Sequence, residues 1–367
     1  MNNKRNGAID LLKFLFGIMI VFYHGRIFSE SERMIFGAGY IAVEFFFLVS
    51  GYLMTAKAYS VSKRENILTG KETTDFILKK VKTMLPHILF AYVVCVIVQF
   101  CITSNPLKFT KLVVHTVWEP LMLWMSGVGT NDLQINAQTW YISAMLLSML
   151  VMYPIMIRKF DLFTHVVAPA AAIFLFGWIA QKHGSLNHYR GWAGITYSGN
   201  LRAIANLSLG SVCWVFAQKL QDVQFSKLGR TVLTIAEVSC YLLVVIGANY
   251  PDEKMMGFVM AALLAVGITI TFSKTSYLNS CFDCTICYWL GNFSLTIYLN
   301  HIIIRKIFQK YDLGLSYKKE LIIFIGVVLV WSLIAHFIMM VLLKQGSKLG
   351  TKLKIALIET EEDVVCK

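Results

Sequence analysis

The segments Asp10-Leu-Leu-Lys13-Phe-Leu-Phe-Gly17-Ile-Met-Ile-Val-Phe-Tyr-His24 and Glu44-Phe-Phe-Phe-Leu-Val-Ser50-Gly51-Tyr52 place ionisable residues inside two apolar stretches, 9–28 and 39–58. Each stretch is close to the roughly 20 residues that an α-helix needs to cross a bilayer. Lys13 and His24 are eleven residues apart. At about 100° and 1.5 Å per residue, both side chains point the same way, about 16 Å apart along the axis. A cation, an imidazole and a carboxylate are costly in lipid, so these residues predict a functional site.

The composition predicts an all-α integral membrane protein. Hydrophobic residues make up 57% of the chain and charged residues 15%, whereas charged residues are about a quarter of an ordinary soluble domain. The first stretch is not expected to be a signal peptide, because it contains Asp10 and Lys13 and lacks a small-residue cleavage pattern. About ten transmembrane helices are predicted, at residues 9–28, 39–58, 85–104, 136–157, 165–181, 200–220, 230–250, 255–273, 289–310 and 320–343.

The distribution of basic residues predicts the orientation. Lysine and arginine are concentrated in the connection 57–84 and at the start of the tail 344–367, although the outer segment 305–319 is also basic. The positive-inside rule then predicts that both termini are cytoplasmic and that the protein lies in the cell membrane. The net charge of +13 is explained by topology and by contact with anionic lipid, so nucleic acid is not implied. We expect one multi-pass domain over 1–343 and a short, basic-then-acidic cytoplasmic tail over 344–367.

The cysteines predict neither a disulfide framework nor a metal centre. Cys281, Cys284 and Cys287 form a C-x2-C-x2-C run, which is part of an iron–sulfur pattern. The fourth ligand expected at the ferredoxin-like spacing is missing, and a membrane span begins instead. No metal and no bound cofactor are therefore predicted.

His24 and Glu44 are predicted to act together. If the second span runs antiparallel to the first, Glu44 lies at the depth of His24, and Gly51 admits the first helix on the same face. A carboxylate that accepts from an imidazole N–H raises the basicity of the ring, as a general base requires. The alternative is an interfacial histidine bonded to the backbone, with a solvated Glu44. Gly17 either leaves a groove on this face or serves close helix packing.

A cationic patch stands at the expected inner end of the third span. It consists of Lys79, Lys80 and Lys82. Such a patch suits the phosphates of a cytosolic donor such as coenzyme A. Contact with lipid headgroups explains the same residues.

Candidates for binding an acceptor lie on the outer side. Trp140 and Tyr141 open the fourth span, and His188 and Arg190 lie in the connection 182–199. Aromatic and polar groups suit sugar rings, but they also form ordinary interfacial belts. Arg202 in the sixth span and His301 in the ninth are further intramembrane polar residues that need partners.

Taken together, these motifs resemble the acyltransferase-3 family, membrane enzymes that O-acylate cell-surface and exported polysaccharides. The resemblance rests on Lys13-x10-His24, on Glu44-Phe-Phe-Phe-Leu-Val-Ser50-Gly51-Tyr52, on Thr139-Trp140-Tyr141-Ile-Ser143 and on Ser294-Leu-Thr-Ile-Tyr298-Leu-Asn-His301. It implies that His24 is the catalytic histidine, Glu44 its acidic partner and Lys13 the basic member of the first pair. The R-x-x-R element of the family corresponds to Lys79 and Lys82. Lysines replace the arginines there and lack their bidentate fork.

The leading hypothesis is therefore a membrane O-acyltransferase, most simply an O-acetyltransferase. Acetyl-CoA would bind Lys13, Lys79, Lys80 and Lys82, and a glycan or lipid-linked saccharide would bind Trp140, Tyr141, His188, Arg190 and Arg202. His24, oriented by Glu44, would deprotonate the acceptor hydroxyl, or would itself carry the acyl group. A secondary transporter that uses the same intramembrane residues is the alternative, and a non-catalytic assembly or sensor protein is a third possibility.

Overall fold

A computed structural model describes residues 5–28, 34–128, 133–250, 255–311 and 313–365, with side chains up to residue 345. The described chain is helical almost throughout, so the predicted fold class is confirmed in this respect. The only described strands are β1 (Trp192–Ala193) and β2 (Thr196–Tyr197), which pair antiparallel. The longer helices are α1 (Gly7–His24), α2 (Ala42–Ser62), α3 (Thr69–Ile102), α4 (Pro106–His115), α5 (Thr139–Arg158), α7 (Ala168–His183), α8 (Ser198–Gln221), α9 (Lys227–Gly247), α10 (Met256–Ser273), α12 (Thr285–Lys310) and α13 (Tyr317–Val365). The short ones are η1 (Gly25–Phe28), η2 (Gly39–Ile41), η3 (Trp124–Ser126), α6 (Phe160–Leu162), η4 (Phe163–Val167) and α11 (Leu278–Phe282).

Several helix starts follow from capping residues in the sequence. The side chain of Asn6 accepts the backbone N–H of Ile9 at 3.1 Å and so begins α1. Ser226 caps α9 in the same way. Asn105 caps α4, where Pro106 occupies the first helical position. These side chains satisfy backbone donors that the first turn of a helix leaves unpaired.

Each predicted span corresponds to a helix, but two of those helices are more polar than the rest. In the described part of the chain, eight helices are long and apolar enough to cross a membrane, as expected for a multi-pass protein. The other two helices are α8 and α12. The buried polar residues Arg202 and His301 lie on these two helices.

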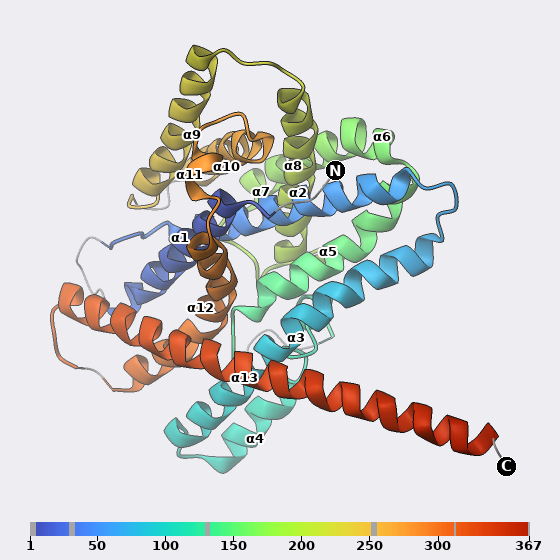
Figure 1. Cartoon of the computed structure of the whole chain (residues 1–367). Coiled ribbons are helices and arrows are strands. Elements are labelled where there is room, and N and C mark those ends of the chain that lie inside the picture. The colour runs from blue at the N-terminus through green and yellow to red at the C-terminus, as the bar shows by residue number, and fades with distance from the viewer. Residues whose placement is uncertain (1–4, 29–33, 129–132, 251–254, 312, 366–367) are drawn as a thin grey trace.

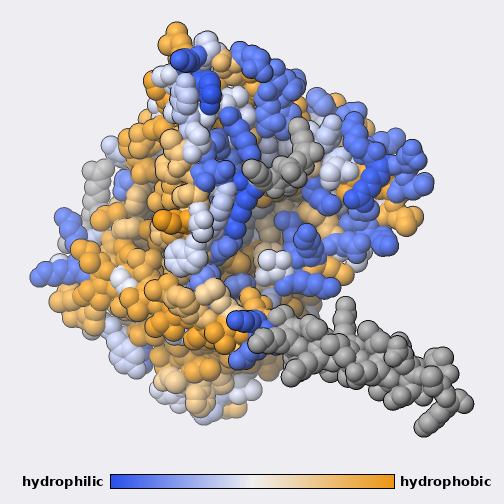
Figure 2. Space-filling model, viewed as in Figure 1, coloured by the Kyte–Doolittle hydropathy of each residue, from blue (hydrophilic) through white to orange (hydrophobic). Residues whose placement is uncertain are grey.

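The helices form one bundle whose two ends differ in character. In Figure 1, α6 lies at the right, together with the C-terminal end of α2 and the N-terminal end of α3. The C-terminal end of α1 lies at the left, and α4 lies at the bottom. Figure 2, in the same view, shows hydrophilic surface gathered at the right and top, and hydrophobic surface over the left and lower part.

Two glycines bring the backbones of α2 and α8 into contact. A Cβ on Gly51 would lie 2.3 Å from the carbonyl oxygen of Leu207, and one on Gly210 would lie 2.3 Å from that of Leu48. The sequence-based expectation that Gly51 admits the first helix is therefore wrong. The residue faces α8, because α8 presents a glycine of its own at the same level.

The face of α1 that carries Lys13, Gly17 and His24 packs against α12 rather than α2. The nearest side-chain atom to a Cβ built on Gly17 is 3.8 Å away, on Ser294, and the ring of His24 lies beside that of His301. Gly17 thus makes ordinary van der Waals contact with α12. Residue numbers rise together along this pair, so α1 and α12 run parallel.

We predict that Gly51→Ala lowers the free energy of unfolding by about 1–3 kcal/mol, because an added methyl group cannot fit against a backbone carbonyl. The matched control is Gly17→Ala, which gains the same helix propensity, about 1 kcal/mol, and has room for its methyl group. Thermal unfolding of both purified variants in detergent measures the difference. Equal melting temperatures would contradict this account of the α2–α8 contact.

Candidate active site

His24 lies half-buried at the C-terminal end of α1, between α5 and α12. Its Nδ1 is 3.2 Å from Nη1 of Arg305, and its Nε2 is 3.0 Å from the side-chain Nε2 of Gln138. The centroid of its ring is 5.0 Å from that of His301. The end of α1, the residue that precedes α5, and α12 therefore meet at one imidazole, although they are far apart in sequence.

Glu44 is not the hydrogen-bond partner of His24, so the predicted contact between them is wrong. Both oxygens of the Glu44 carboxylate bind the guanidinium of Arg202, at 2.5 Å to Nε and 2.8 Å to Nη2. The two side chains are 0% and 1% exposed. A carboxylate at this depth needs a full counter-charge, and the planar fork of an arginine matches both of its oxygens, which an imidazole cannot do.

Arg202 connects this ion pair to the predicted acceptor residues. Its guanidinium lies over the ring of Trp140, 5.3 Å from the centroid, and Trp140 stacks on Tyr189 at 4.4 Å. Arg190 donates to the Tyr189 hydroxyl at 3.1 Å. The structure therefore brings Trp140, Arg190 and Arg202 together around Tyr189.

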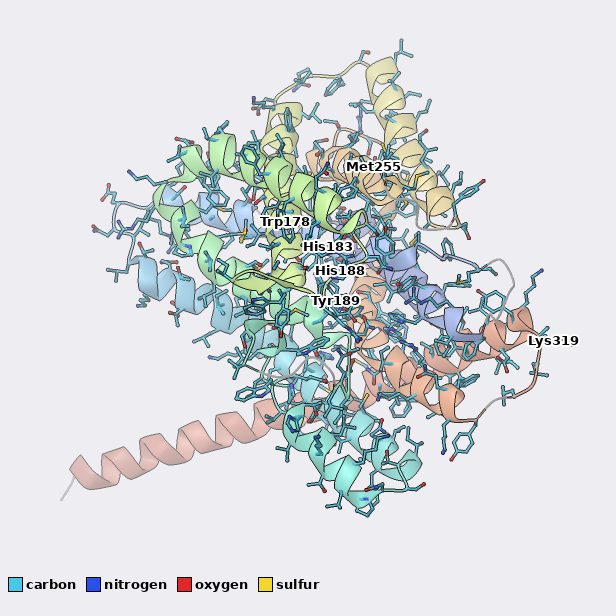
Figure 3. All side chains as sticks on the ribbon, turned by 180° about the vertical axis from the view of Figure 1, so that it is seen from behind. Trp178, His183, His188, Tyr189, Met255 and Lys319 are labelled. Carbon is cyan, nitrogen blue, oxygen red and sulfur yellow. The ribbon has the colours of Figure 1, made fainter. Side chains whose placement is uncertain are left out.

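His188 and Tyr141 border the same region. Burial and the charge of Arg202 lower the pKa of His188, which favours the neutral form of its ring. Its ring stacks on that of His183 at 3.9 Å, and Figure 3 shows the two rings together next to Tyr189. Tyr141 turns instead toward α2, where its ring lies 4.5 Å from that of Phe47.

A buried carboxylate holds the segment that carries Gln138. The oxygens of Glu119 accept the backbone N–H groups of Ile135 at 2.8 Å and Asn136 at 2.6 Å. Burial raises the pKa of Glu119 to about 7, although these two donors and nearby Lys306 act in the opposite direction. The hydroxyl of Tyr298 donates to the carbonyl of Gln138 at 2.9 Å. The amide that contacts His24 is thus positioned from both α12 and the loop before α5.

The sequence patterns predicted no role for Arg305, and they did not predict that Gln138 contacts His24 or that Glu119 holds the segment before α5. Arg305 was counted among the outer-loop charges, yet α12 continues to Lys310 and buries much of it. Lys306 likewise lies within the helix and donates to Gln99 at 2.9 Å. The spacing of Arg305 four residues after His301 was a usable signal, because residues i and i+4 share one helix face.

The cationic residues expected to bind the donor lie at the other end of α1. Lys13 pairs with the buried Asp10 at 3.0 Å, and Arg5 pairs with the same carboxylate. Lys80 is close enough to Lys13 for their charges to repel. Lys13 of α1 and the cationic stretch of α3 therefore lie in one region.

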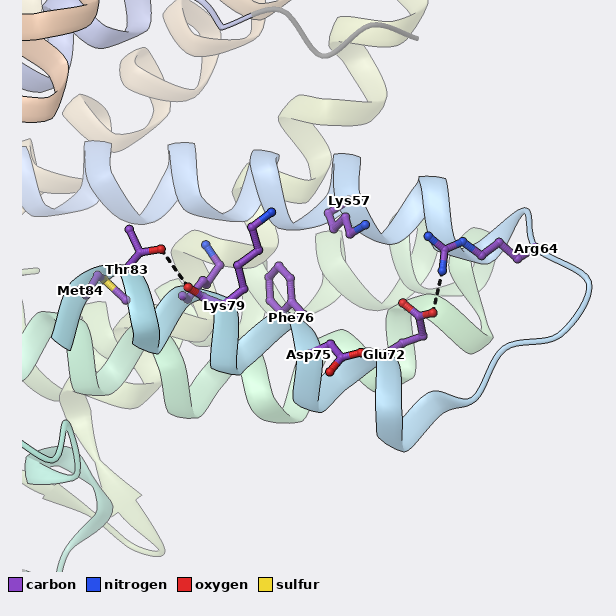
Figure 4. Close-up of a pocket in the computed structure, with 9 residues that line it drawn as sticks. Lys57, Arg64, Glu72, Asp75, Phe76, Lys79, Thr83 and Met84 are labelled. Carbon is purple, nitrogen blue, oxygen red and sulfur yellow. Dashed lines mark hydrogen bonds and ion pairs between the residues drawn. The ribbon is translucent and has the colours of Figure 1, made fainter. Parts of the chain in front are cut away.

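A cavity of about 620 Å³ opens between α2 and α3, beside the connection that joins them. Figure 4 shows Lys57 on the α2 side and Lys79 on the α3 side, and Lys80 and Arg64 also line the cavity. Lys82 is exposed and is not among the lining residues. Two of the three predicted phosphate-binding lysines thus face a common space.

The C-x2-C-x2-C run lies at the junction of α11 and α12. The sulfurs of Cys284 and Cys287 are 3.4 Å apart. Among the described residues, no group of three or more histidine, cysteine, aspartate or glutamate side chains is arranged to hold a metal ion.

We predict that Glu44→Gln lowers the free energy of unfolding by about 3–5 kcal/mol, because it leaves the guanidinium of Arg202 buried without a counter-charge. The control is Glu72→Gln in the exposed Arg64–Glu72 pair, where a loss of about 1 kcal/mol or less is expected. Denaturant titration of the two variants in mixed micelles compares them. A similar loss in both would show that burial does not determine the strength of the Glu44–Arg202 pair.

Comparison with known proteins supports the resemblance seen in the motifs. Searches among curated proteins and among solved structures find no significant match. A family model described as an acyltransferase domain matches residues 6–342, nearly the whole chain. This match includes α1, α2, the cationic stretch of α3 and the His301 segment of α12. The chain therefore belongs to the acyltransferase-3 family.

Proposed function

We propose that this acyltransferase transfers an acetyl group from cytosolic acetyl-CoA to a hydroxyl of a cell-surface or exported glycan. The observation that carries the proposal is the position of His24. It joins a region of aromatic and polar residues at one end of α1 to a region of cationic residues near the other. The cationic region would bind the phosphates of the donor, and the aromatic and polar region would bind the hydroxyl groups of the acceptor.

The proposal includes ten membrane spans and two cytoplasmic termini. Along α2 and α8, the contacts Glu44–Arg202, Gly51–Leu207 and Thr55–Ser211 follow one another in the same direction. The two helices therefore run parallel, as do α1 and α12. Parallel pairs are expected if α8 is the sixth span and α12 the ninth, because helices separated by an even number of crossings run the same way. Both polar helices would then cross the cell membrane inside the bundle, where apolar helices shield them from lipid.

For the donor, we propose that the phosphates of acetyl-CoA bind in the cavity between α2 and α3. Lys57, Lys79 and Lys80 supply positive charge there. Lys13 lies next along the path toward His24, about 16 Å away on the same helix face. The extended arm of coenzyme A would place the thioester near His24.

For the acceptor, we propose that a saccharide of an exopolysaccharide or a lipid-linked precursor binds near Trp140, Tyr189 and Arg190. The exposed guanidinium of Arg190 contacts both Tyr189 and Gln134. Aromatic faces and fixed polar groups together suit a sugar ring. Glu44 acts in this region indirectly, since it holds Arg202 against Trp140.

In this reaction the hydroxyl oxygen forms a bond to the acyl carbon, the carbon–sulfur bond breaks, and the hydroxyl proton finally reaches the coenzyme A thiolate. His24 is the central residue of the proposal, and Arg305 and Gln138 replace Glu44 as the groups that orient its ring. The reaction needs one group that transfers the proton and another that stabilises negative charge on the carbonyl oxygen. Both must be held in fixed positions beside the thioester, and the surroundings of His24 supply such groups.

We predict that His24→Ala abolishes acetate on the surface glycan while the abundance of the protein in the membrane is unchanged. The control is His165→Ala, which replaces an exposed histidine of η4 and should leave acetylation at the wild-type level. Mass spectrometry of glycan from the two strains measures acetate directly. Acetylation retained in His24→Ala would overturn the proposal, and wild-type protein that transports a solute without consuming acetyl-CoA would favour a transporter.

We predict that Lys79→Gln combined with Lys80→Gln raises the KM for acetyl-CoA at least about tenfold, which corresponds to 1.4 kcal/mol of lost binding, with a smaller change in kcat. The control is Lys82→Gln, because Lys82 belongs to the same cationic run but does not line the cavity. Initial rates of thiol release across a range of acetyl-CoA concentrations separate the two constants. Equal KM values for the wild-type protein, the double variant and Lys82→Gln would contradict the proposal that acetyl-CoA binds in this cavity.

A further inference from the structure

His24 has no free lone pair in this structure, although the sequence suggested it as the general base. A neutral imidazole carries one proton and one lone pair. Arg305 approaches Nδ1 and can only donate, and Gln138 approaches Nε2. Because the Gln138 amide can turn and the guanidinium cannot supply an acceptor, the favoured arrangement has Nδ1 accepting from Arg305 and Nε2–H donating to Gln138. In either tautomer the single lone pair of the ring accepts a hydrogen bond, from Arg305 at Nδ1 or from Gln138 at Nε2.

His301 on α12, unlike His24, has a ring nitrogen whose lone pair no described residue engages. Its side chain is 0% exposed, and its Nδ1 is 3.2 Å from the carbonyl oxygen of Ile297. A carbonyl only accepts, so Nδ1 carries the proton and Nε2 carries the lone pair. That Nε2 is buried and has no hydrogen-bond partner among the described residues. Nδ1 of His301 faces the backbone of α12, so the unpaired Nε2 lies on the side of the ring that is farther from that backbone.

A free donor accompanies this free acceptor. The Nε of Arg305 is also buried without a partner in the described part of the chain. Arg305 follows His301 by one helical turn on the same face of α12, and its Nη1 already contacts His24. Buried polar atoms are nearly always paired in folded proteins. The unpaired acceptor of His301 and the unpaired donor of Arg305, one helical turn apart, therefore suit a ligand that donates to the first and accepts from the second, as a hydroxyl and a carbonyl oxygen would.

We propose that His301 is the base that takes the proton of the acceptor hydroxyl, and that Arg305, whose guanidinium is held by His24, stabilises the carbonyl oxygen of the thioester. This inference rests on the proposed acyl transfer and assigns the roles within it. The hydroxyl proton moves to Nε2 of His301 as the oxygen bonds to the acyl carbon. The carbon–sulfur bond then breaks, and the same proton passes from His301 to the thiolate of coenzyme A. Negative charge on the carbonyl oxygen is met by the unpaired Nε–H of Arg305.

The first test replaces His301 by glutamine, which is of similar size and forms hydrogen bonds but cannot act as a base at neutral pH. We expect His301→Gln to lower kcat for thiol release from acetyl-CoA, with water as the acceptor, about 100-fold or more. The KM for acetyl-CoA should be unchanged. The rate of wild-type protein should fall at acidic pH as the base is protonated, and this dependence should disappear in the variant. The matched control is His336→Gln, a buried histidine that packs against α12 through Thr296, whose rate should equal that of wild type.

The second test covers the case in which His301→Gln folds poorly. His301→Gly should be inactive alone and should recover activity when imidazole is added, whereas His24→Ala should not recover. Wild-type kcat and pH dependence in His301→Gln, or no rescue of a folded His301→Gly, would overturn the assignment of the base. Failure of wild-type protein to consume acetyl-CoA would instead overturn the proposed acyl transfer itself.

Discussion

The buried ion pair between Glu44 and Arg202 is the interaction on which the arrangement of the inner helices depends. Either charge alone inside the bundle would strongly destabilise the fold. The bidentate contact between the two side chains fixes the distance and the register of α2 and α8. Gly51 and Gly210 allow the two backbones to approach at that register. The guanidinium then supports Trp140 and through it Tyr189. The core of the bundle and the aromatic cluster of Trp140 and Tyr189 are thus coupled by one pair of charges.

The same requirement explains which helices occupy the interior. α8 and α12 carry polar and charged side chains, and both lie among other helices rather than at the surface. Each runs parallel to one of the first two helices and supplies the partner for its ionisable residue. Arg202 of α8 meets Glu44, and Arg305 and His301 of α12 meet His24. Apolar helices such as α9 and α13 expose their side chains instead, as surfaces in contact with lipid do.

The two histidines at the α1–α12 contact differ through their hydrogen bonds rather than their type. Contacts from Arg305 and Gln138 engage both nitrogens of His24, whereas a single backbone carbonyl engages one nitrogen of His301 and leaves the other with its lone pair. Identical side chains therefore receive different chemical roles from their neighbours. In the proposed reaction, this division separates His301, which takes a proton, from His24, which holds the Arg305 guanidinium that stabilises negative charge on the substrate.

The sequence by itself determined the helical membrane class, a helix for each predicted span and the choice of Lys13, His24, Glu44 and Arg202 as candidate site residues. These features follow from local properties, namely the length of apolar runs and the free-energy cost of ionisable groups within them. Spacing along one helix also placed Lys13 and His24 on a common face. The tertiary structure alone decided the partners, because sequence periodicity describes one helix at a time and says nothing about which helix lies opposite. Adjacent spans suggested Glu44 for His24, but the geometry of a carboxylate favoured the fork of Arg202, and His24 met α12, some 280 residues away.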